Sequence, residues 1–336
     1  MDGADARDPR EALAPFVRAM ARGPSRGRGL TRDEARAAAT SILSGEAAPE
    51  AVGALFMLMR YRGESAGEIA GFVEAMRARI EDWRDVGAAV DWPSYAAGRT
   101  RGAPLFLMSA RLVAASGRPV LIHGWNSHLV HPVTTAAGVA ALGAPVARSP
   151  AEARAALSAS GIAYVPLDAL DGEALRLLQL RQVLGLRSPL NTVLRALNPA
   201  GAPATVQGVF HPSYRALQTE AASLLGQLAI GVVKGGGGEF ERHPGKAVEL
   251  YGYAAEGAFD RKMPATMESD ARRLKADGAD VTPEAFTALW TGARRDPFEE
   301  AAVIATAGAA LYVAGAAPDL AGAEALATEL WENRTT

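Results

Sequence analysis

The sequence predicts an α/β protein with a small N-terminal helical bundle and a larger α/β domain built on a mainly parallel central sheet. Two observations lead to this prediction. The N-terminal part places apolar residues at helical spacing between capping signals, whereas after Asp91 short apolar runs alternate with helical segments. The chain has 336 residues, enough for two domains. We place the helical domain at residues 1–85 and the α/β domain, with its anion-binding loops, at residues 86–336.

Capping residues mark the expected helices of the N-terminal part. Asp8, followed by a proline, is typical of a helix start. Thr31 with Glu34 forms the pattern of a capping box, which predicts a second helix behind it. Two more helices are expected at Pro49–Arg62 and Ser65–Ile80, and together the segments predict a bundle.

The second part alternates between strands and helices. Candidate strands are Pro119–His123, Ile162–Pro166, Ala204–Phe210, Leu228–Val233 and Ala247–Tyr253. Helices are expected at Leu105–Ala115, Thr134–Leu142, Pro150–Ser160, Tyr214–Leu225, Pro297–Val313 and Leu320–Trp331. Because parallel strands bind ligands beyond their carboxyl ends, the loops after these strands are where chemistry is expected.

The composition favours a reducing compartment. The chain has no cysteine, so it can form neither a disulfide nor a thiolate metal site. The N-terminal residues lack the apolar core of a signal peptide, and no apolar run reaches the ~20 residues of a membrane span. We therefore expect a cytoplasmic protein with no membrane partner.

The distribution of charge is more informative than the net charge of −2. Two stretches, Trp92–Ala151 and Ala174–Thr219, contain no aspartate or glutamate, yet each contains five arginines. These arginines are Arg99, Arg101, Arg111, Arg118 and Arg148 in the first stretch, and Arg176, Arg181, Arg187, Arg195 and Arg215 in the second. Acid-free, arginine-bearing stretches favour a site for a phosphate-rich ligand.

Three loops are candidates for ligand contact. Asp91–Gly102 combines small residues with two arginines, which suits either an anion cradle or an ordinary glycine-containing turn. His123 ends a strand and is a candidate base, phosphate contact or packed, hydrogen-bonded histidine. Lys234 and Arg242 bracket four glycines and two glutamates, a pattern that suits close backbone contact with a ligand or a flexible surface loop.

Recognised motifs are absent from these loops. His123, His128 and His131 lack the spacing of a helical zinc pair, and no carboxylate lies near them in the sequence. The chain also lacks a nucleophile elbow, a Walker A loop and a dinucleotide-binding glycine pattern.

Four segments resemble glycosyltransferase family 3, in particular its anthranilate phosphoribosyltransferase-like members. They are Leu30–Arg77, Ile122–Gly143 with its His-Gly, Arg181–Pro199 with its Arg-x-x-Leu-Gly-x-Arg pattern, and the glycine-rich Lys234–Arg242. The resemblance implies a nucleoside phosphorylase-like fold and a helical domain joined by part of residues 171–196. It also implies a homodimer formed through that domain, for which we name Leu55, Phe56 and Met59. The remnant of the family's donor loops would comprise Ser94, Tyr95, Gly98, His123, Gly124 and Asn191.

The sequence departs from the family pattern at the phosphate loops. The family's Gly-Thr-Gly-Gly-Asp is replaced by residues 94–99, and its Lys-His-Gly-Asn has become Ile122-His-Gly-Trp125. In the Asp-Glu pair that holds Mg²⁺ in the family, Phe240 stands in place of the aspartate and only Glu241 remains. Stabilisation of a leaving diphosphate needs such groups, so transfer to anthranilate is not expected.

The altered pattern is similar to the YbiB-like branch of the family, which implies a homodimer that binds nucleic acid through a basic groove. We therefore expect sequence-tolerant binding of DNA or RNA, with no catalytic residue, metal or cofactor. The expected phosphate contacts are Arg187, Arg195, Lys234 and Arg242, then Arg181, Arg99 and Arg101. Tyr95 and Trp125 are candidate stacking platforms or packed side chains.

Two other interpretations remain open. The first is an active phosphoribosyltransferase that uses phosphoribosyl diphosphate and Mg²⁺ with a different acceptor. In it, His123 and Gly124 would contact the donor, Glu241 would hold the metal, and Arg181 or Arg187 would bind an anionic acceptor. The second is a scaffold that has kept only a structural role.

Overall fold

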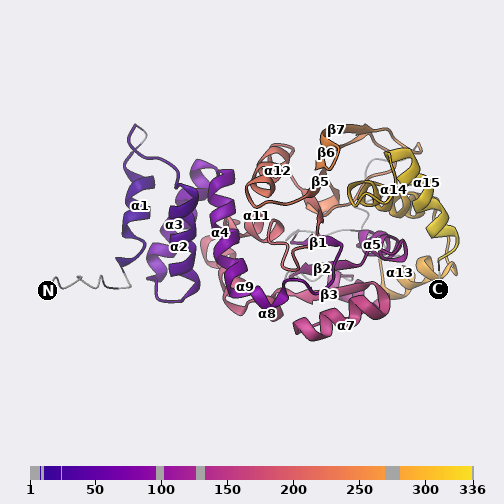
Figure 1. The fold of residues 1–336 in the computed structure, drawn as a ribbon, viewed down its shortest axis with the longest axis horizontal. Coiled ribbons are helices and arrows are strands. Elements are labelled where there is room, and N and C mark those ends of the chain that lie inside the picture. The colour runs from indigo at the N-terminus through magenta and orange to yellow at the C-terminus, as the bar shows by residue number, and fades with distance from the viewer. Residues whose placement is uncertain are drawn as a thin grey trace.

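The computed structural model describes Asp8 and residues 11–23, 25–95, 102–125, 133–268 and 281–334. A helical bundle lies at one end of the molecule and a sheet with its covering helices at the other (Figure 1). The expected fold class is confirmed: a helical N-terminal part precedes a larger α/β part with a mostly parallel sheet.

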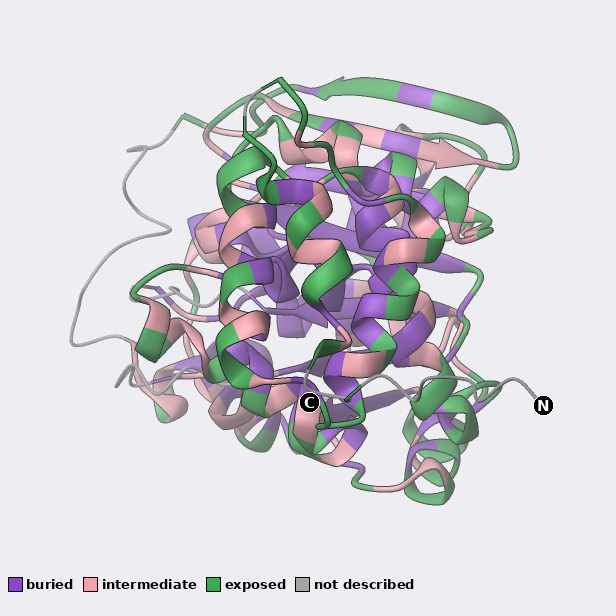
Figure 2. Cartoon of the chain, turned by 90° about the vertical axis from the view of Figure 1, so that its left-hand side faces the viewer, coloured by how far each residue is buried: buried purple, intermediate pink, exposed green. Residues whose placement is uncertain are grey.

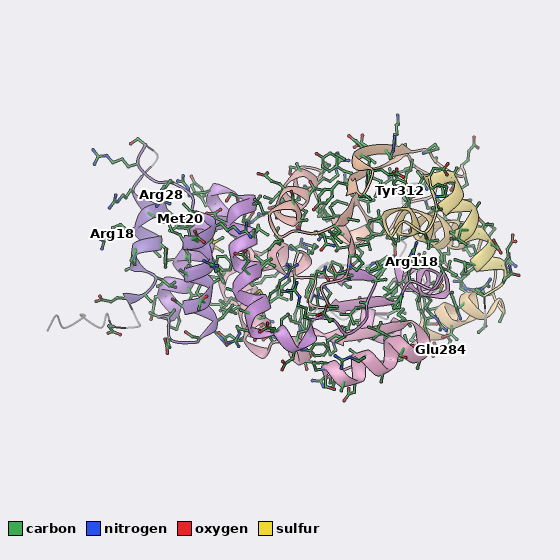
Figure 3. All side chains as sticks on the ribbon, viewed as in Figure 1. Arg18, Met20, Arg28, Arg118, Glu284 and Tyr312 are labelled. Atoms are coloured by element: carbon green, nitrogen blue, oxygen red, sulfur yellow. The ribbon has the colours of Figure 1, made fainter. Side chains whose placement is uncertain are left out.

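The bundle begins with α1 (Ala14–Ala21), α2 (Arg32–Leu43), α3 (Pro49–Arg62) and α4 (Ala66–Arg79). The helix start expected at Asp8 lies next to residues outside the described ranges; the Glu11 N–H donates to the Asp8 carbonyl oxygen at 2.8 Å, and α1 begins at Ala14, with a proline in its first turn. A proline is tolerated at that position but not inside a helix. Figure 3 shows Arg18 of α1 pointing outward, while Met20 is buried in the bundle.

The capping box at Thr31 is confirmed, and Glu34 is its acidic partner. Arg28 donates two hydrogen bonds of 2.6 Å to the Glu34 carboxylate, and the Thr31 N–H donates one of 2.9 Å. Led by the bond from Arg28, these contacts lower the pKa of Glu34 from 4.5 to about 2. Because the folded pKa lies below the unfolded one, the stabilisation is present above the unfolded value and is lost as the pH falls toward 2.

We expect Glu34→Gln to lower the free energy of unfolding near neutral pH by about 1 kcal/mol or less, since the ion pair is solvent-exposed. The difference between variant and parent should shrink as the pH approaches the folded pKa of about 2. Urea denaturation near neutral pH and near pH 2 measures this difference in the free energy of unfolding. An equal difference at both ends would contradict the assignment of the stabilisation to the charged carboxylate.

The described residues form a seven-stranded sheet in the order β3-β2-β1-β4-β5-β6-β7. Strands β1 to β5 run parallel, and β6 and β7 form an antiparallel hairpin at the edge. The strands are β1 (Val90–Ser94), β2 (Val120–Gly124), β3 (Ile162–Pro166), β4 (Ala204–Val209), β5 (Ala229–Lys234), β6 (Val248–Ala254) and β7 (Gly257–Met263).

Two strands escaped the sequence-based prediction. The first residues of the expected loop Asp91–Gly102 belong to the central strand β1, whose Asp, Pro and Ser residues are depleted in strands generally. Strand β1 pairs with β2 over five residue pairs but with β4 over only two, at Val90 and Asp91. Strand β7 is a largely exposed edge strand with charged residues, so it lacks the apolar alternation of a half-buried strand.

Helices cover both faces of the sheet, as the alternation of side chains along its strands requires. In β2, Val120 and Ile122 pack in one core with α5, α14 and α15, while Leu121 packs in the other core, beside α4 and α7. Figure 2 shows the buried residues in the interior and exposed residues on the outward faces of the helices. The predicted helices are present as α5 (Phe106–Ala115), α6 (Thr135–Ala141), α7 (Pro150–Ser160), α12 (Tyr214–Leu224), α14 (Pro297–Val313) and α15 (Leu320–Glu332).

The remaining helices are short or join the bundle. They are α8 (Leu167–Leu170), α9 (Gly172–Gln179), α10 (Arg181–Leu184), α11 (Leu190–Arg195), α13 (Pro283–Thr291) and the 3₁₀ turns η2 (Glu81–Trp83) and η3 (Gly236–Gly238). Helix α11 packs against both α4 and α9 (Figure 1). Among the described residues, no helix has the length and apolar character needed to cross a membrane.

The surface of the bundle differs from the expected one. Leu55, Phe56 and Met59 are fully buried, so they cannot provide an exposed dimer contact. They point into the core because that side of α3 packs against its neighbours in the bundle. Among the described residues of this domain, large apolar side chains that are exposed include Tyr61 on α3, Val183 on α10 and Leu186 directly after α10.

A close backbone approach holds the loop after β5 against the end of β4. A Cβ atom added to Gly208 would lie 1.9 Å from the carbonyl carbon of Glu239. Gly208→Ala must therefore displace the loop, and we expect it to lower the free energy of unfolding by about 1–3 kcal/mol. Gly172→Ala is the control, because nothing lies within 4 Å of its added Cβ. Equal melting temperatures for the two variants would show that the approach is not tight.

Candidate functional site

The carboxyl ends of the parallel strands gather the loops that the sequence singled out. Ser94 ends β1, Gly124 ends β2 and Lys234 ends β5. A Cβ atom on Gly124 would lie 2.3 Å from the Ser94 carbonyl oxygen, so only glycine fits there. Ligand sites of parallel sheets lie at this edge.

The glycine-rich loop after β5 folds back over this edge. The Ser94 hydroxyl donates to Glu239 Oε1 at 3.1 Å and lies 3.0 Å from the Thr135 hydroxyl at the start of α6. Glu241 accepts a hydrogen bond of 3.1 Å from the backbone N–H of Phe106, at the start of α5. The structure thus brings the first and third predicted loops together and places the buried Glu241 carboxylate at the start of α5, where negative charge is favoured.

Beneath this edge lies a buried chain of polar groups. His123 is fully buried, with Nε2 3.0 Å from Asp91 Oδ1 and Nδ1 2.8 Å from the Tyr95 hydroxyl. Asp91 also accepts a hydrogen bond of 2.7 Å from Thr205 on β4. Burial is the main cause that raises the pKa of Tyr95 well above its usual range. Of the three roles considered for His123, the structure favours the packed, hydrogen-bonded one.

The aromatic stacking platforms are not where the sequence suggested. Tyr95 is buried and its ring packs edge-on against His123, so it offers no face to a base. Trp125 is half-buried and packs against the core. Both side chains therefore follow the packed alternative that the sequence left open.

The Asp-Glu pair that the resemblance implies for Mg²⁺ is not complete, and the carboxylates that this loop does carry are those of Glu239 and Glu241, both buried. Phe240, at the position of the missing aspartate, is buried and packs edge-on against Trp92, with ring centroids 5.5 Å apart. The Glu241 carboxylate is engaged by the start of α5. In the described ranges, no three His, Asp or Glu side chains are grouped as metal ligands. His128 and His131 lie outside the described residues.

Two of the predicted arginines line one cleft of about 90 Å³ between the bundle and the sheet. Arg195 is buried and donates to the carbonyl oxygens of Asn191 at 3.0 Å and of Tyr95 at 3.3 Å. Burial lowers the pKa of Arg195 to about 10, so it stays charged at neutral pH. Burial, with repulsion from Arg181 and Arg60, also lowers the pKa of Arg187. Repulsion between these cations favours a bound anion.

The same cleft holds polar atoms that need a partner. Ser188 Oγ, Asn191 Oδ1 and Gln218 Oε1 are buried, and none has a hydrogen-bond partner among the described residues. A buried polar atom without a partner costs free energy, so such atoms at a cleft indicate a ligand or water that completes them. Sequence reasoning named Asn191 but missed Ser188 and Gln218. The pattern Arg187-Ser188 ahead of α11 was the only available signal.

A third predicted phosphate contact, Arg242, has a different role. Its guanidinium is buried, forms an ion pair with Glu324 of α15 and donates to the Pro264 carbonyl oxygen at 2.6 Å. It therefore lies away from the cleft. The predicted ligand contact is corrected: Arg242 has a structural role. Lys234 is exposed at the end of β5, and Arg181 is half-buried at the start of α10. Gly98, Arg99 and Arg101 lie outside the described residues.

Comparison with known proteins places both parts of the chain in one family. The helical bundle domain of a glycosyl transferase family matches residues 14–80, and the a/b domain of that family matches residues 104–335. The anthranilate phosphoribosyltransferase of Methylorubrum extorquens is 32% identical over 311 residues, which cover 89% of each chain. That of Geobacillus kaustophilus is 30% identical and covers 92% of each.

Solved structures agree with this assignment. Anthranilate phosphoribosyltransferase from Thermus thermophilus superimposes with a TM-score of 0.77 at 25% identity, covering 96% of this chain and 94% of its own. The Saccharomyces cerevisiae enzyme in complex with PRPP and Mg gives a TM-score of 0.74 at 13% identity, covering 95% and 93%, and shares the fold. The chain therefore belongs to the glycosyl transferase family that contains the anthranilate phosphoribosyltransferases, with both the helical bundle and the a/b domain of that family.

Proposed function

We propose that this protein is a phosphoribosyltransferase that transfers a ribosyl phosphate group to an anionic acceptor other than anthranilate. The observation that carries the proposal is the cleft in which Arg187 and Arg195 converge with three buried polar atoms that lack partners. This cleft opens at the carboxyl edge of the sheet, next to the glycine-rich loop.

The relatives support the donor half of the proposal. The relatives from M. extorquens and G. kaustophilus match at least 89% of this chain. Both are named anthranilate phosphoribosyltransferases. The S. cerevisiae structure is a complex with PRPP and Mg. By this likeness, the donor would lie at Ser94, Gly124 and the loop that carries Glu239.

The cleft itself supports the acceptor half. Arg187 and Arg195 supply positive charge, which suits a carboxylate or phosphate on the acceptor, whereas Arg60 lies 3.9 Å from the carboxylate of Glu64, which also lines the cleft. Asn191 Oδ1 and Gln218 Oε1 are carbonyl-type oxygens, so they accept hydrogen bonds from N–H or O–H groups of the ligand. The acceptor would therefore combine an anionic group with hydrogen-bond donors. The volume of about 90 Å³ fits its charged end rather than a whole ligand.

The transfer breaks the bond between ribosyl C1 and a diphosphate oxygen, which leaves with the electron pair, and the acceptor then bonds to C1 and loses a proton. Charge grows on the leaving oxygen and needs nearby cations or N–H groups. Because the Asp-Glu pair that the resemblance implies is incomplete here, this chain would depend on Lys234 and the backbone N–H groups of the glycine-rich loop to neutralise the leaving diphosphate. In this respect the chain would differ from the family, whose Asp-Glu pair holds Mg²⁺ at the diphosphate.

Nucleic-acid binding is the second candidate, and the group of cations at the same edge favours it. Arg60, Arg181 and Arg187 interact electrostatically, and Lys234 is exposed. A phosphate backbone needs such distributed cations rather than a pair of carboxylates. In this case the binding would be sequence-tolerant and would weaken steeply as salt rises.

Calorimetric titration with phosphoribosyl diphosphate, with and without Mg²⁺, tests the proposal together with a gel-shift titration against single-stranded and duplex DNA and RNA. Binding of the diphosphate, and release of pyrophosphate when anionic acceptors are added, would support the transferase. Binding of nucleic acid with a steep salt dependence, and no binding of the diphosphate, would overturn it in favour of the second candidate.

We also propose a homodimer formed through the helical domain, with its contact moved to Tyr61 and Val183. Gly53 of α3 faces Leu184 of α10, so the two helices that carry these exposed side chains are neighbours. Light scattering measures the molar mass, and a monomer at micromolar concentration would contradict the proposal. A cytoplasmic location remains a prediction, which cell fractionation tests.

A further inference from the structure

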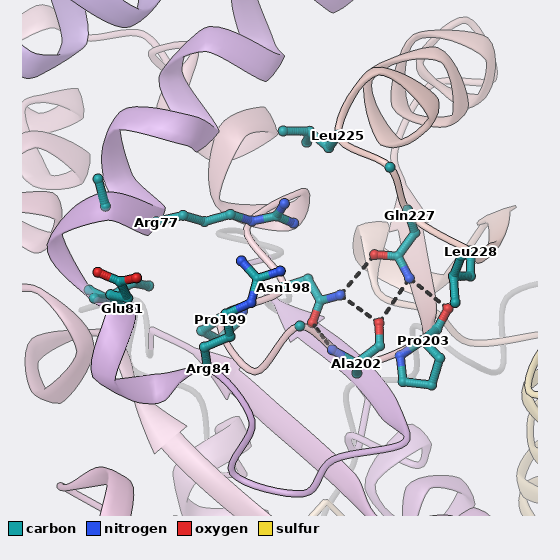
Figure 4. Close-up of a pocket in the computed structure, with 14 residues that line it drawn as sticks. Arg77, Glu81, Arg84, Asn198, Pro199, Ala202, Pro203, Leu225, Gln227 and Leu228 are labelled. Atoms are coloured by element: carbon teal, nitrogen blue, oxygen red, sulfur yellow. Dashed lines mark hydrogen bonds between the residues drawn. The ribbon is translucent and has the colours of Figure 1, made fainter.

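A second hollow lies at the opposite, amino-terminal edge of the sheet. It has a volume of about 510 Å³ and lies between the end of α4, η2 and the segments that lead into β4 and β5. Its walls carry Arg77, Arg84, Asn198 and Gln227, with apolar surface from Pro203 and Leu228 (Figure 4). None of these residues belongs to the cleft of Arg187 and Arg195.

Two guanidinium groups enter this hollow without a carboxylate between them. Arg77 Nε donates to the Leu197 carbonyl oxygen at 2.7 Å, an interaction that orients the group but does not neutralise it. Within the described part of the chain, the Arg84 side chain forms no hydrogen bond or ion pair, and its stem lies along Gly201, 3.6 Å from an added Cβ. Figure 4 shows both guanidinium groups pointing toward the same space beside Asn198.

The electrostatics of the pair favour an anion. Burial is the main cause that lowers the pKa of Arg77; attraction to Asp91 opposes this shift, and repulsion from Arg84 adds to it. Of the acidic residues in the segment around η2, only Glu81 lines the hollow, and it is exposed at the rim. An anion placed between the two guanidinium groups would relieve their repulsion and form charge-assisted hydrogen bonds to both.

The floor of the hollow is fixed. Asn198 Nδ2 donates to the Ala202 carbonyl oxygen and to Gln227 Oε1, each at 2.8 Å, and Asn198 Oδ1 accepts from the Ala202 N–H at 2.9 Å. Asn198 has a φ of 40°, a left-handed conformation that this network holds in place. Since the two amides satisfy each other, the arginines are the groups left to contact a ligand.

We propose that this hollow is a second binding site, for a phosphorylated small molecule of mononucleotide size whose phosphate lies between Arg77 and Arg84. Its volume falls within the ~300–1,000 Å³ typical of ligand pockets and exceeds what a bare phosphate fills. The apolar surface of Pro203 and Leu228 suits the non-phosphate part of such a ligand.

The site also has a direct connection to the cleft at the other edge. Arg77 donates to the carbonyl oxygens of Ala196 and Leu197, which follow directly after Arg195. Helix α11, which carries Asn191 and Arg195, therefore ends on the arginine that would hold the second ligand. A ligand that pulls Arg77 toward Arg84 acts on the end of this helix, so occupancy of the two sites should be linked.

Calorimetric titration of the full chain with adenosine 5′-monophosphate, ribose 5-phosphate and inorganic phosphate tests the proposal. The mononucleotide should bind more tightly than phosphate, and Arg84→Ala should weaken its binding about tenfold or more. Arg84 is exposed and forms no side-chain hydrogen bond, so this variant should keep its fold, which circular dichroism checks. Arg36→Ala, which removes an exposed arginine of α2, is the matched control and should bind as the parent does.

Arg187→Ala separates the two sites. Mononucleotide binding that survives Arg187→Ala but not Arg84→Ala supports the second site, whatever the outcome at the first. Binding that is lost in Arg187→Ala and kept in Arg84→Ala would place the ligand in the cleft and overturn the proposal. Equal affinity for phosphate and the mononucleotide would also overturn it, because the apolar wall would then contribute nothing.

Discussion

Arg242→Ala is expected to lower the free energy of unfolding by about 3–5 kcal/mol. The guanidinium of Arg242 is buried, so its removal leaves Glu324 without its partner and the Pro264 carbonyl oxygen without a donor. The loss would loosen the glycine-rich loop from α15, because the side chain of Arg242 is the link between them. Urea denaturation followed by circular dichroism measures the change.

Arg148→Ala is the matched control for this prediction. Arg148 also forms an ion pair, with Asp168, but 59% of its side chain is exposed. Exposed pairs contribute little, so we expect this variant to unfold at nearly the same urea concentration as the parent. If Arg242→Ala were as stable as the parent and instead bound phosphate ligands more weakly, the structural role assigned to Arg242 would be wrong.

Arg187→Ala should leave stability nearly unchanged and weaken binding of an anionic ligand by about 10- to 100-fold. Arg187 is only half-buried and lines the cleft, where Arg181 and Arg60 already repel it. Its removal therefore takes away a cation that a ligand needs and relieves a repulsion that the empty cleft contains. Calorimetry with inorganic phosphate as the anionic probe, or with nucleic acid if that is the ligand found, measures the loss.

Arg176→Ala provides the comparison for Arg187→Ala. Arg176 also lies in the acid-free stretch, but it pairs with Glu173 within α9 and does not line the cleft. We expect ligand affinity to stay at the parental value in this variant. A similar loss of affinity in both variants would mean that overall charge, rather than the cleft, determines binding.

The fold was predictable where local signals and tertiary packing agree. The box of Thr31 and Glu34 fixes the start of α2, and proline fixes the starts of α3 and α7. Strand β1 was missed because Asp91 and Ser94 are poor strand residues. Asp91 Oδ2 accepts a hydrogen bond from Thr205, and the Ser94 hydroxyl donates one to Glu239; both partners lie far away in the sequence. Such long-range partners decide the conformation there, and no local pattern reveals them.

The candidate site was predictable only in part, for a related reason. Glu241 and Arg242 are neighbours in the sequence, yet one contacts the start of α5 and the other contacts α15. Charge counting gives the sign of each residue but not the element that it contacts, and these two adjacent side chains contact different helices. Arg195 shows the same limit, because its burial against Tyr95 depends on how the bundle meets the sheet.

The short pairing of β1 with β4 has an evolutionary consequence. Because the two strands share a ladder only near Val90 and Asp91, they part before the carboxyl edge, and loops rather than strands fill the opening. Residues in that opening can be exchanged without breaking the hydrogen-bonded ladder on either side. Phe240, which stands where the resemblance implies an aspartate, would be one such exchange, and its ring packs on Trp92. This scaffold can therefore change its ligand and keep its architecture.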